Sequence, residues 1–324
     1  MTAASVRPVV WADQSERFTT TPAVGDDALR HVTATRYVAP LREGGSLPGL
    51  VEADDDGLYV MKFRGAGQGP AALVAEVVGG ELARALGLLV PELVVAELEP
   101  ELARAEPDVE IQELADASAG ANLGVDFLPG ALPFTPAAGG AVPPELAAEL
   151  VWFDTLVMNV DRTPRNPNLL VWHGRTWLID HGAAFYRQHG EAPLADSARA
   201  GFPLIREHVL LGRAGALAQA DRRLAPVAQQ AIESVVARVP DVWLGPDPLA
   251  RRADFAAFLD GRLRAPRTFV SEAEAARREV AVGTVIADRP PRRSQRAGLP
   301  HWAPASGDSG EALLGPGMQD ARQR

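Results

Sequence analysis

The amino-acid sequence predicts an α+β fold in two lobes, a small lobe built on an antiparallel sheet followed by a larger, mainly helical lobe. After residue 30, short runs rich in β-branched and aromatic residues alternate with turn residues, a pattern typical of strands. The second half of the chain instead has long segments with apolar residues at helical spacing. With 324 residues, the chain is long enough for two lobes that each have a core.

Composition and charge restrict the class of protein. The hydrophobic fraction of 47% and the charged fraction of 23% are ordinary for a globular protein. The net charge of −10 argues against a nucleic-acid or anionic-membrane surface, because phosphate groups require a basic face. The sequence has no cysteine, which excludes disulfides and thiolate metal sites, and no apolar run of membrane-spanning length. We therefore expect a cytoplasmic protein without membrane or direct nucleic-acid partners.

The small lobe is expected to occupy residues 31–112, after an N-terminal extension, residues 1–30, that shows no clear period. Strands are predicted at residues 31–41, 50–53, 58–63 and 90–98. A helix is predicted over residues 71–88, although the pair Gly79–Gly80 is unfavourable inside a helix.

The second lobe is expected over residues 113–285. It begins with a predicted loop, residues 117–144, which is rich in glycine, proline and alanine. The clearest helix of the chain follows, opened by Pro143 and Pro144. A β-hairpin over residues 169–180 comes next, with His173–Gly174 at its tip.

The rest of the second lobe is predicted to be helical. Helices are expected at residues 202–212, 215–239 and 247–264. In the last of these, Asp247 is the expected N-cap and Pro248 the first helical residue. Residues 286–324, rich in Pro, Gly, Ser and Arg, are expected to form a disordered tail.

A polar cluster directly follows the clearest helix and suggests the chemistry. Asp161 and Asn166 have the D-x-x-x-x-N spacing of a kinase catalytic loop, in which Asp is the base and Asn binds Mg²⁺. Asp180, in "LIDHG" after the hairpin, has the position of a second metal-binding aspartate. Oxygen ligands of this kind suit Mg²⁺. The alternative is that the asparagines, including Asn159 and Asn168, only cap helices and satisfy turns.

Lys62 is the only lysine of the sequence, whereas the other 31 basic side chains are arginine. A lysine is required where a compact point charge must fit a tight site, and on the third strand of a kinase it binds the ATP phosphates. Its expected helical partner is Glu76, with Glu81 as second choice; the alternative is a surface pair. Gly45 and Ser46, in the turn between the first two strands, are predicted to help bind the nucleotide, although "REGGSLPG" is not a G-x-G-x-x-G motif.

The stretches "YVMKF", "NVDRTPRNPNLL" and "WLIDHGAAF" resemble the HipA-like kinases, specifically a short, mainly actinobacterial group. The resemblance extends from about residue 31 to about residue 280. It implies a protein-kinase-like bilobal fold that uses ATP and Mg²⁺. By matching positions it implies that Lys62 binds phosphate, that Asp161 is the base, and that Asn166 and Asp180 bind the metal. His181 stands where protein kinases have the Phe of Asp-Phe-Gly. This difference makes the chain more similar to the HipA and phosphoinositide-kinase branch.

We therefore expect an ATP- and Mg²⁺-dependent kinase that phosphorylates a hydroxyl group, first of all a Ser or Thr of a protein. A small-molecule or lipid-type kinase, and a nucleotide-binding pseudokinase without transfer activity, remain alternatives. Arg162 and Arg165 are expected to form local ion pairs rather than hold a substrate phosphate. Asn168 is expected to support the metal loop, and His181 to be packed.

Overall fold

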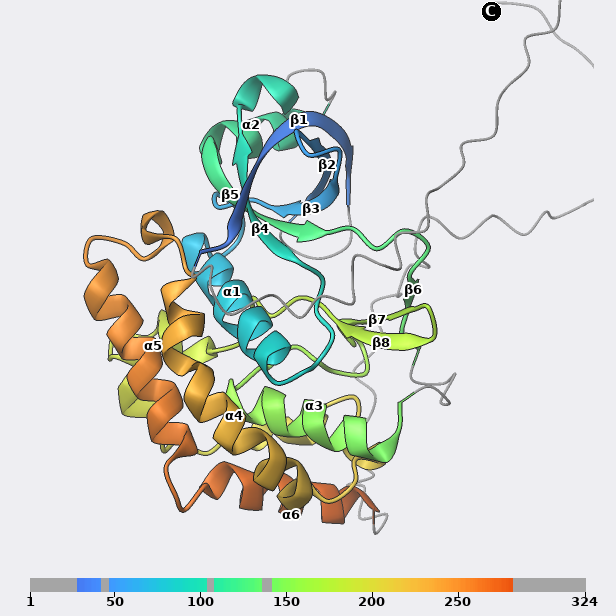
Figure 1. Cartoon of the computed structure of the whole chain (residues 1–324), viewed down its shortest axis with the longest axis vertical. Coiled ribbons are helices and arrows are strands. Elements are labelled where there is room, and N and C mark those ends of the chain that lie inside the picture. Colours follow the sequence, from blue (N-terminus) through green and yellow to red (C-terminus); the bar gives the residue numbers. More distant parts are fainter. Residues whose placement is uncertain (1–27, 42–46, 104–107, 136–141, 282–324) are drawn as a thin grey trace, which may run out of the picture. The chain divides into compact units, whose positions relative to one another are not determined.

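The computed structural model describes residues 28–41, 47–103, 108–135 and 142–281 (Figure 1). These residues belong to one compact unit and combine a sheet with helices, so the predicted mixed α/β class is confirmed. The predicted tail, residues 286–324, lies outside the described residues, as do Gly45 and Ser46 and nearly all of the predicted extension, residues 1–30.

Five strands close into a barrel in the order β1-β2-β3-β5-β4. The strands are β1 (Arg30–Pro40), β2 (Gly49–Ala53), β3 (Leu58–Lys62), β4 (Leu93–Leu98) and β5 (Gly120–Asp126). Neighbouring strands are antiparallel except for β1 and β4, which pair in parallel. Alternate residues such as Val32, Val51 and Met61 fill the barrel interior, as the period-2 pattern predicts. Closure leaves this sheet without open edges.

The prediction of a loop over residues 117–144 is wrong for β5. This strand lies between β3 and β4, and Gly124 pairs with both Met61 and Val94. A Cβ atom at Gly124 would lie 2.7 Å from a methyl group of Val94, so the barrel requires glycine here. Asn122 is buried and its Oδ1 accepts a hydrogen bond from the backbone of Arg64 at 2.8 Å. Gly124 and Asn122 are residue types common in loops, but here contacts with other segments of the chain place them inside strand β5.

A helix that the sequence did not predict, α2 (Val109–Ala117), precedes β5. Asp108 caps it, since its side chain accepts a hydrogen bond from the backbone N–H of Glu110 at 3.1 Å. The expected lobe boundary at residue 112 falls inside this helix, and the sheet continues to Asp126.

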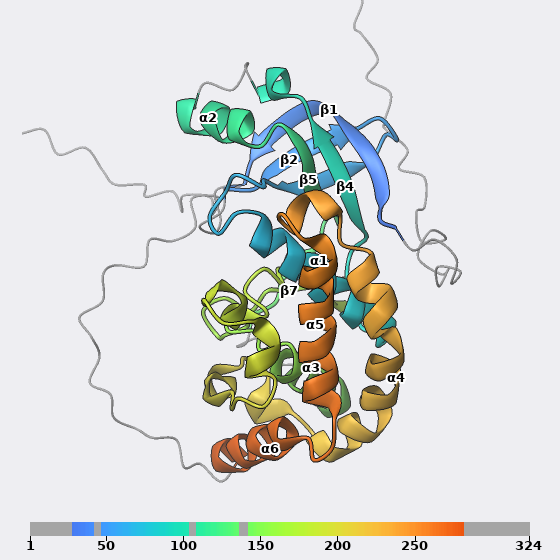
Figure 2. The same ribbon diagram turned by 90° about the vertical axis from the view of Figure 1, so that its left-hand side faces the viewer.

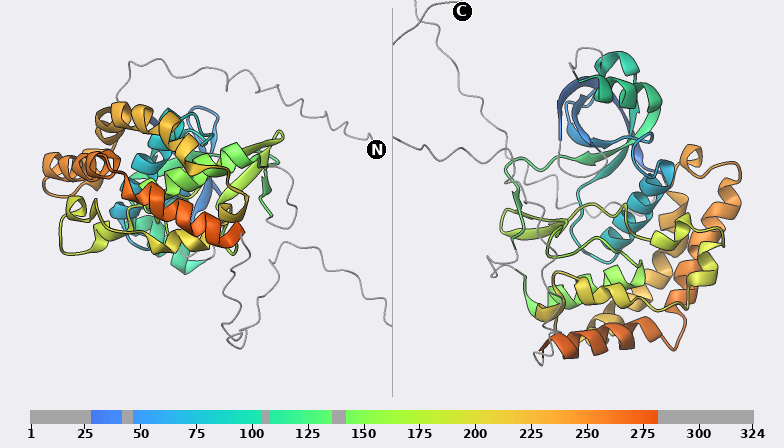
Figure 3. Two further views of the ribbon diagram at one scale, coloured as in Figure 1. Left: turned by 90° about the horizontal axis from the view of Figure 1, so that it is seen from below. Right: turned by 180° about the vertical axis from the view of Figure 1, so that it is seen from behind.

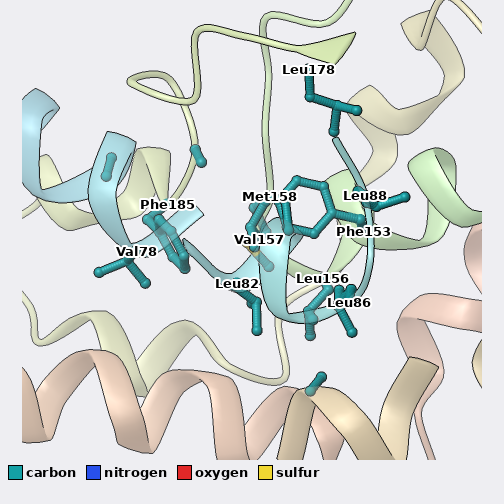
Figure 4. Packing of buried hydrophobic residues seen from close by; sticks show 14 of the residues in the cluster. Val78, Leu82, Leu86, Leu88, Phe153, Leu156, Val157, Met158, Leu178 and Phe185 are labelled. Carbon is teal, nitrogen blue, oxygen red and sulfur yellow. The ribbon is translucent and has the colours of Figure 1, made fainter. Parts of the chain in front are cut away.

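Helix α1 (Pro70–Ala85) forms where it was predicted, and its two glycines have a packing role. A Cβ atom at Gly79 would lie 3.0 Å from the Cβ of His181, and one at Gly80 would lie 2.8 Å from Leu93 Cδ1. Close approach of these neighbours thus offsets the low helix propensity of glycine. Figure 4 shows the core that α1 shares with the end of α3 and with residues after the hairpin. Its labelled members include Val78, Leu82, Leu86, Phe153, Leu156, Val157, Leu178 and Phe185.

The remaining helices are α3 (Pro144–Leu156), α4 (Leu217–Ala237), α5 (Pro248–Leu263) and α6 (Thr268–Ala281). As predicted, Pro144 opens α3, and Asp247 caps α5 by accepting a hydrogen bond from Ala250 N–H at 3.0 Å. Figures 2 and 3 show α4 and α5 side by side, with α6 at the end opposite the barrel. None of the helices in the described ranges combines the length and apolarity needed to cross a membrane.

The predicted hairpin consists of β7 (Leu169–Trp172) and β8 (Arg175–Leu178), and the short β6 (Leu132–Pro133) pairs with β7. His173 and Gly174 both have positive φ, at 47° and 71°, as a tight hairpin turn requires. The hairpin and α1 lie between the barrel and α3 (Figures 1 and 3).

The prediction of a helix at residues 202–212 is wrong. Two short 3₁₀ turns, Pro203–Glu207 and Leu211–Arg213, occupy this segment. Between them His208 has an extended backbone and bonds the buried carboxylate of Asp154, which interrupts the helix. Further 3₁₀ turns lie at Pro100–Ala103, Tyr186–His189, Leu194–Ser197 and Asp241–Trp243.

Candidate functional site

Lys62, at the end of β3, lies between two carboxylates that are far from it in sequence. Because Met61 points into the barrel, the alternation of the strand turns Lys62 to the outside, toward α1. Its Nζ bonds Glu76 Oε1 of α1 and lies 2.8 Å from Asp180 Oδ1. The side chain of Lys62 is only 15% exposed, so this is not a surface pair. The structure thus brings three of the predicted site residues together.

The charges of Lys62 and Glu76 stabilise each other, whereas that of Asp180 is disfavoured. Burial lowers the pKa of Lys62, but the Glu76 and Asp180 carboxylates outweigh it and raise that pKa above its ordinary value. Burial would raise the pKa of Glu76, yet the Lys62 ammonium holds it well below its usual range. For Asp180 the Lys62 ammonium lowers the pKa, but desolvation and the Glu76 carboxylate outweigh it, so the pKa is raised. Lys62 and Glu76 are therefore a permanent ion pair at neutral pH.

Glu81, the second choice for the lysine partner, does not contact Lys62. Its carboxylate accepts a hydrogen bond at 2.8 Å from Arg238, the residue that directly follows α4. The Nε atom of Arg84 lies 3.7 Å from the other carboxylate oxygen. Glu81 therefore ties α1 to α4, which fixes the helix that carries Glu76.

The segment Asp180–His181–Gly182 is fitted around Glu76. The backbone N–H of His181 donates to Glu76 Oε2 at 2.8 Å, and a Cβ atom at Gly182 would lie 3.1 Å from Glu76 Oε1. The ring of His181 is 1% exposed and lies edge-on to Phe153 at 5.9 Å, so this histidine is packed, as expected. The imidazole ring of His181 thus packs in the core as an aromatic side chain would, while the backbone N–H of His181 holds Glu76.

Asp161 is held by the asparagines around it. Its Oδ2 accepts hydrogen bonds from Asn166 Nδ2 at 2.7 Å and from Asn168 Nδ2 at 3.2 Å. The Oδ1 of Asn159 accepts a hydrogen bond from the backbone N–H of Asp161 at 3.1 Å. Because the amide nitrogen of Asn166 is used in this contact, its amide oxygen is the atom that can bind a metal. The contact made by Asn168 agrees with its expected supporting role.

The two clusters are joined by the backbone. The N–H of Ile179, directly before Asp180, donates to the carbonyl of Asn168 at 3.1 Å. Asn168 and Asp180 have positive φ of 49° and 58°, as does Met158, before the loop that carries Asp161, at 52°. Such conformations are costly for residues other than glycine and concentrate at functional sites.

The predicted metal ligands, Asn166 and Asp180, have the oxygen chemistry that Mg²⁺ prefers. Asn166 supplies an amide oxygen and Asp180 a carboxylate whose side chain is 47% exposed, and Mg²⁺ prefers oxygen ligands. Within the described residues no three His, Cys, Asp or Glu side chains gather as a metal site. A magnesium ion would thus take most of its ligands from water and phosphate, as is usual when it binds with a nucleotide.

Sequence reasoning missed two residues beneath this site, Asp154 and His208. Both are buried: Asp154 accepts a hydrogen bond from Arg162, the neighbour of Asp161, and His208 in turn bonds Asp154. Arg162 is 1% exposed, so it forms a local ion pair, as expected, and is not available to a substrate phosphate. The available signal for Asp154 was that it is the one charged residue in the largely apolar run of residues 150–158.

Comparison with known proteins gives one family match. A family model of HipA-like kinases matches residues 35–259, a segment that begins in β1, ends in α5 and contains all of the site residues described above. The crystal structure of a Helicobacter pylori proinflammatory kinase, CtkA, is similar with a TM-score of 0.46 and 13% sequence identity, covering 75% of this chain and 97% of that chain. No curated protein matches the sequence.

Proposed function

Because the chain belongs to the HipA-like kinase family, we propose that it is an ATP- and Mg²⁺-dependent kinase that phosphorylates a hydroxyl group. The contact of Lys62 with both Glu76 and Asp180 is the observation that carries this proposal. A strand lysine, a helical glutamate and an aspartate after a hairpin converge, as phosphate binding in a kinase requires.

We also propose that the fold is bilobal. Strands β1–β5 with α1 and α2 form the N-lobe, and α3–α6 with the hairpin form the C-lobe. The expected N-lobe, residues 31–112, is thereby extended to Asp126, because β5 pairs with β3 and β4. The separate apolar cluster inside the barrel supports this division for the strands, whereas the core residues of α1 pack with those of the C-lobe.

In the proposed site Lys62 binds the ATP phosphates while Glu76 keeps its ammonium in place. Lys62 also bonds Asp180, and in the proposed complex the phosphate oxygens of ATP compete with that carboxylate for the ammonium group. Gly45 and Ser46 stay proposed nucleotide contacts. Asn166 and Asp180 would hold Mg²⁺, which supplies charge neutralisation for the transferred phosphate.

Asp161 is the proposed general base. It takes the proton of the acceptor hydroxyl as that oxygen bonds the γ-phosphorus and the bond to the bridging oxygen of ADP breaks. The hydrogen bonds from Asn166 and Asn168 to Oδ2 orient the carboxylate for this transfer. Catalysis then consists of positioning and charge stabilisation.

A protein Ser or Thr is the proposed acceptor, with a small molecule or lipid as the alternative. The proposed location is the cytoplasm, which the lack of cysteine supports. The competing function is a nucleotide-binding pseudokinase, for which the absence of G-x-G-x-x-G in "REGGSLPG" is the supporting observation. The presence of Lys62, Asp161, Asn166 and Asp180 together favours the enzyme.

Nucleotide binding tests the metal ligands. By mass-action linkage, ATP at 100 times its Kd stabilises a protein by about 2.7 kcal/mol. We expect ATP alone to raise the Tm modestly and ATP with Mg²⁺ to raise it clearly more, measured by differential scanning fluorimetry. In Asp180→Asn the additional shift caused by Mg²⁺ should shrink. Equal shifts with and without Mg²⁺ in the wild-type protein would exclude the proposed roles of Asn166 and Asp180.

A further inference from the structure

A buried ion pair lies directly beneath the two loops of the site. The side chains of Arg162 and Asp154 are both 0% exposed, and Arg162 Nε lies 2.6 Å from Asp154 Oδ2. Removing two charges from water is costly, and apolar residues of the same volume often stabilise a core equally well. The Nη2 atom of Arg162 is moreover buried without a hydrogen-bond partner among the described residues. The pair is therefore not optimised for stability, and another role accounts for it better.

Asp154 anchors the pair to the helical part of the protein. Its carboxylate accepts hydrogen bonds from Arg162 Nε, from Asn159 Nδ2 at 3.0 Å and from His208 Nε2 at 2.9 Å. The backbone N–H of Leu210 donates to His208 Nδ1 at 3.1 Å, which fixes the tautomer with its proton on Nε2. Burial raises the pKa of Asp154, but Arg162 and His208 outweigh it and hold that pKa well below its usual range. Asp154 is thus a fixed anion with three donors.

The other end of the guanidinium reaches both loops of the site. Arg162 Nη1 donates to the carbonyl of Asn168 and, at 3.4 Å, to the carbonyl of Ile179. Asn168 holds the Asp161 carboxylate, and Ile179 directly precedes Asp180. One planar group therefore connects the loop of the base with the loop of the metal ligand.

We propose that Arg162 is a positioning residue for phosphoryl transfer, which Asp154 and His208 hold in place. It sets the position of Asp161 relative to Asp180 and maintains the left-handed backbone of Asn168 and Asp180. The inference rests on the proposed kinase function, because it concerns the geometry of that site. Arginine is required because two separate nitrogens of its planar fork, Nε and Nη1, reach Asp154 and the two carbonyls, whereas lysine has a single nitrogen.

Arg162→Lys tests this role because it retains the charge and removes the fork. We expect a folded protein whose kcat falls by about 10²-fold, the loss that a misplacement of about 1 Å can cause. The gain in ATP affinity caused by Mg²⁺ should also decrease, because Asp180 is no longer held. Arg267→Lys is the matched control, since Arg267 forms a two-bond pair with Asp221 away from these loops. It should lower the Tm without changing kcat or the Mg²⁺ effect.

His208 provides a second test if Arg162→Lys does not fold. His208→Gln retains a donor for Asp154 and should keep most of the wild-type kcat and of the Mg²⁺ effect, whereas His208→Leu should lower both. The proposal is wrong if Arg162→Lys, or His208→Leu in its place, lowers the Tm as Arg267→Lys does and leaves kcat unchanged.

A wild-type protein without transfer activity would refute the kinase function, and with it the predicted effect on kcat, while the positioning of Asp180 by Arg162 is still tested by metal binding. In that case the inference is tested by the gain in ATP affinity that Mg²⁺ causes. Loss of this gain in Arg162→Lys supports the positioning of Asp180. A gain in Arg162→Lys as large as that of the wild-type protein overturns the inference. Where only the histidine variants fold, His208→Leu and His208→Gln are compared by the same measurement.

Discussion

Asp161→Asn is expected to lower the rate of phosphoryl transfer by roughly 10²–10⁴-fold, the usual contribution of a general base, without changing the affinity for ATP and Mg²⁺. The amide oxygen of the new side chain can still accept the hydrogen bonds that Asn166 and Asn168 donate to Oδ2, so the loop keeps its shape. It cannot take up the proton of the acceptor hydroxyl. Initial rates with γ-labelled ATP and calorimetric titration with a non-hydrolysable ATP analogue measure the two quantities separately.

Asp180→Asn is the control for this experiment, because it should weaken the Mg²⁺-dependent part of nucleotide binding as well as transfer. A transfer rate near that of the wild type in Asp161→Asn would remove Asp161 from the role of base. A loss of ATP affinity in that variant would instead place Asp161 among the nucleotide or metal ligands.

Lys62→Arg is expected to lower phosphoryl transfer by roughly 10²–10³-fold, as does removal of a single charge-stabilising donor in other enzymes. Lys62 Nζ occupies the narrow space between Glu76 and Asp180, and a planar guanidinium cannot fit there as a point charge. The retained positive charge still compensates buried Glu76, so the fold should survive. The rate of transfer from γ-labelled ATP tests the predicted loss of activity, and far-UV circular dichroism tests whether the fold survives.

Arg36→Lys is a suitable control, because Arg36 pairs with Glu52 on the exposed surface of the barrel, with its own side chain 59% exposed. This exchange should leave rate and Tm unchanged. Wild-type activity in Lys62→Arg would mean that the single lysine of the chain is an accident of composition.

Much of the fold could be predicted because its signals are local. The hairpin turn at His173–Gly174 and the cap at Asp247 are determined by a few neighbouring residues, and the structure has both. Strand β5 could not be predicted, because Gly124 is required by contact with Val94 of another strand and not by its own segment. The helix predicted around His208 fails for the same reason, since a distant carboxylate interrupts it.

The site divides in the same way. Lys62, Asp161 and Asp180 stand in recognisable local patterns, and the structure places the first and last of these in contact. The Asp154–Arg162 pair has no local pattern, because its meaning depends on burial and on carbonyl groups of two other segments. A charged residue within an apolar helical segment, such as Asp154, therefore predicts a buried partner of opposite charge elsewhere in the chain.

Phosphoryl transfer by the wild-type protein is the most direct test of the kinase function. The protein is incubated with γ-labelled ATP, Mg²⁺ and cell lysate, and the labelled products are separated into protein, lipid and small-molecule fractions. We predict label on serine or threonine of a protein, dependent on Mg²⁺ and absent with Asp161→Asn. Wild-type protein that binds ATP with Mg²⁺ but labels nothing in any fraction, itself included, would contradict the kinase function and leave the pseudokinase.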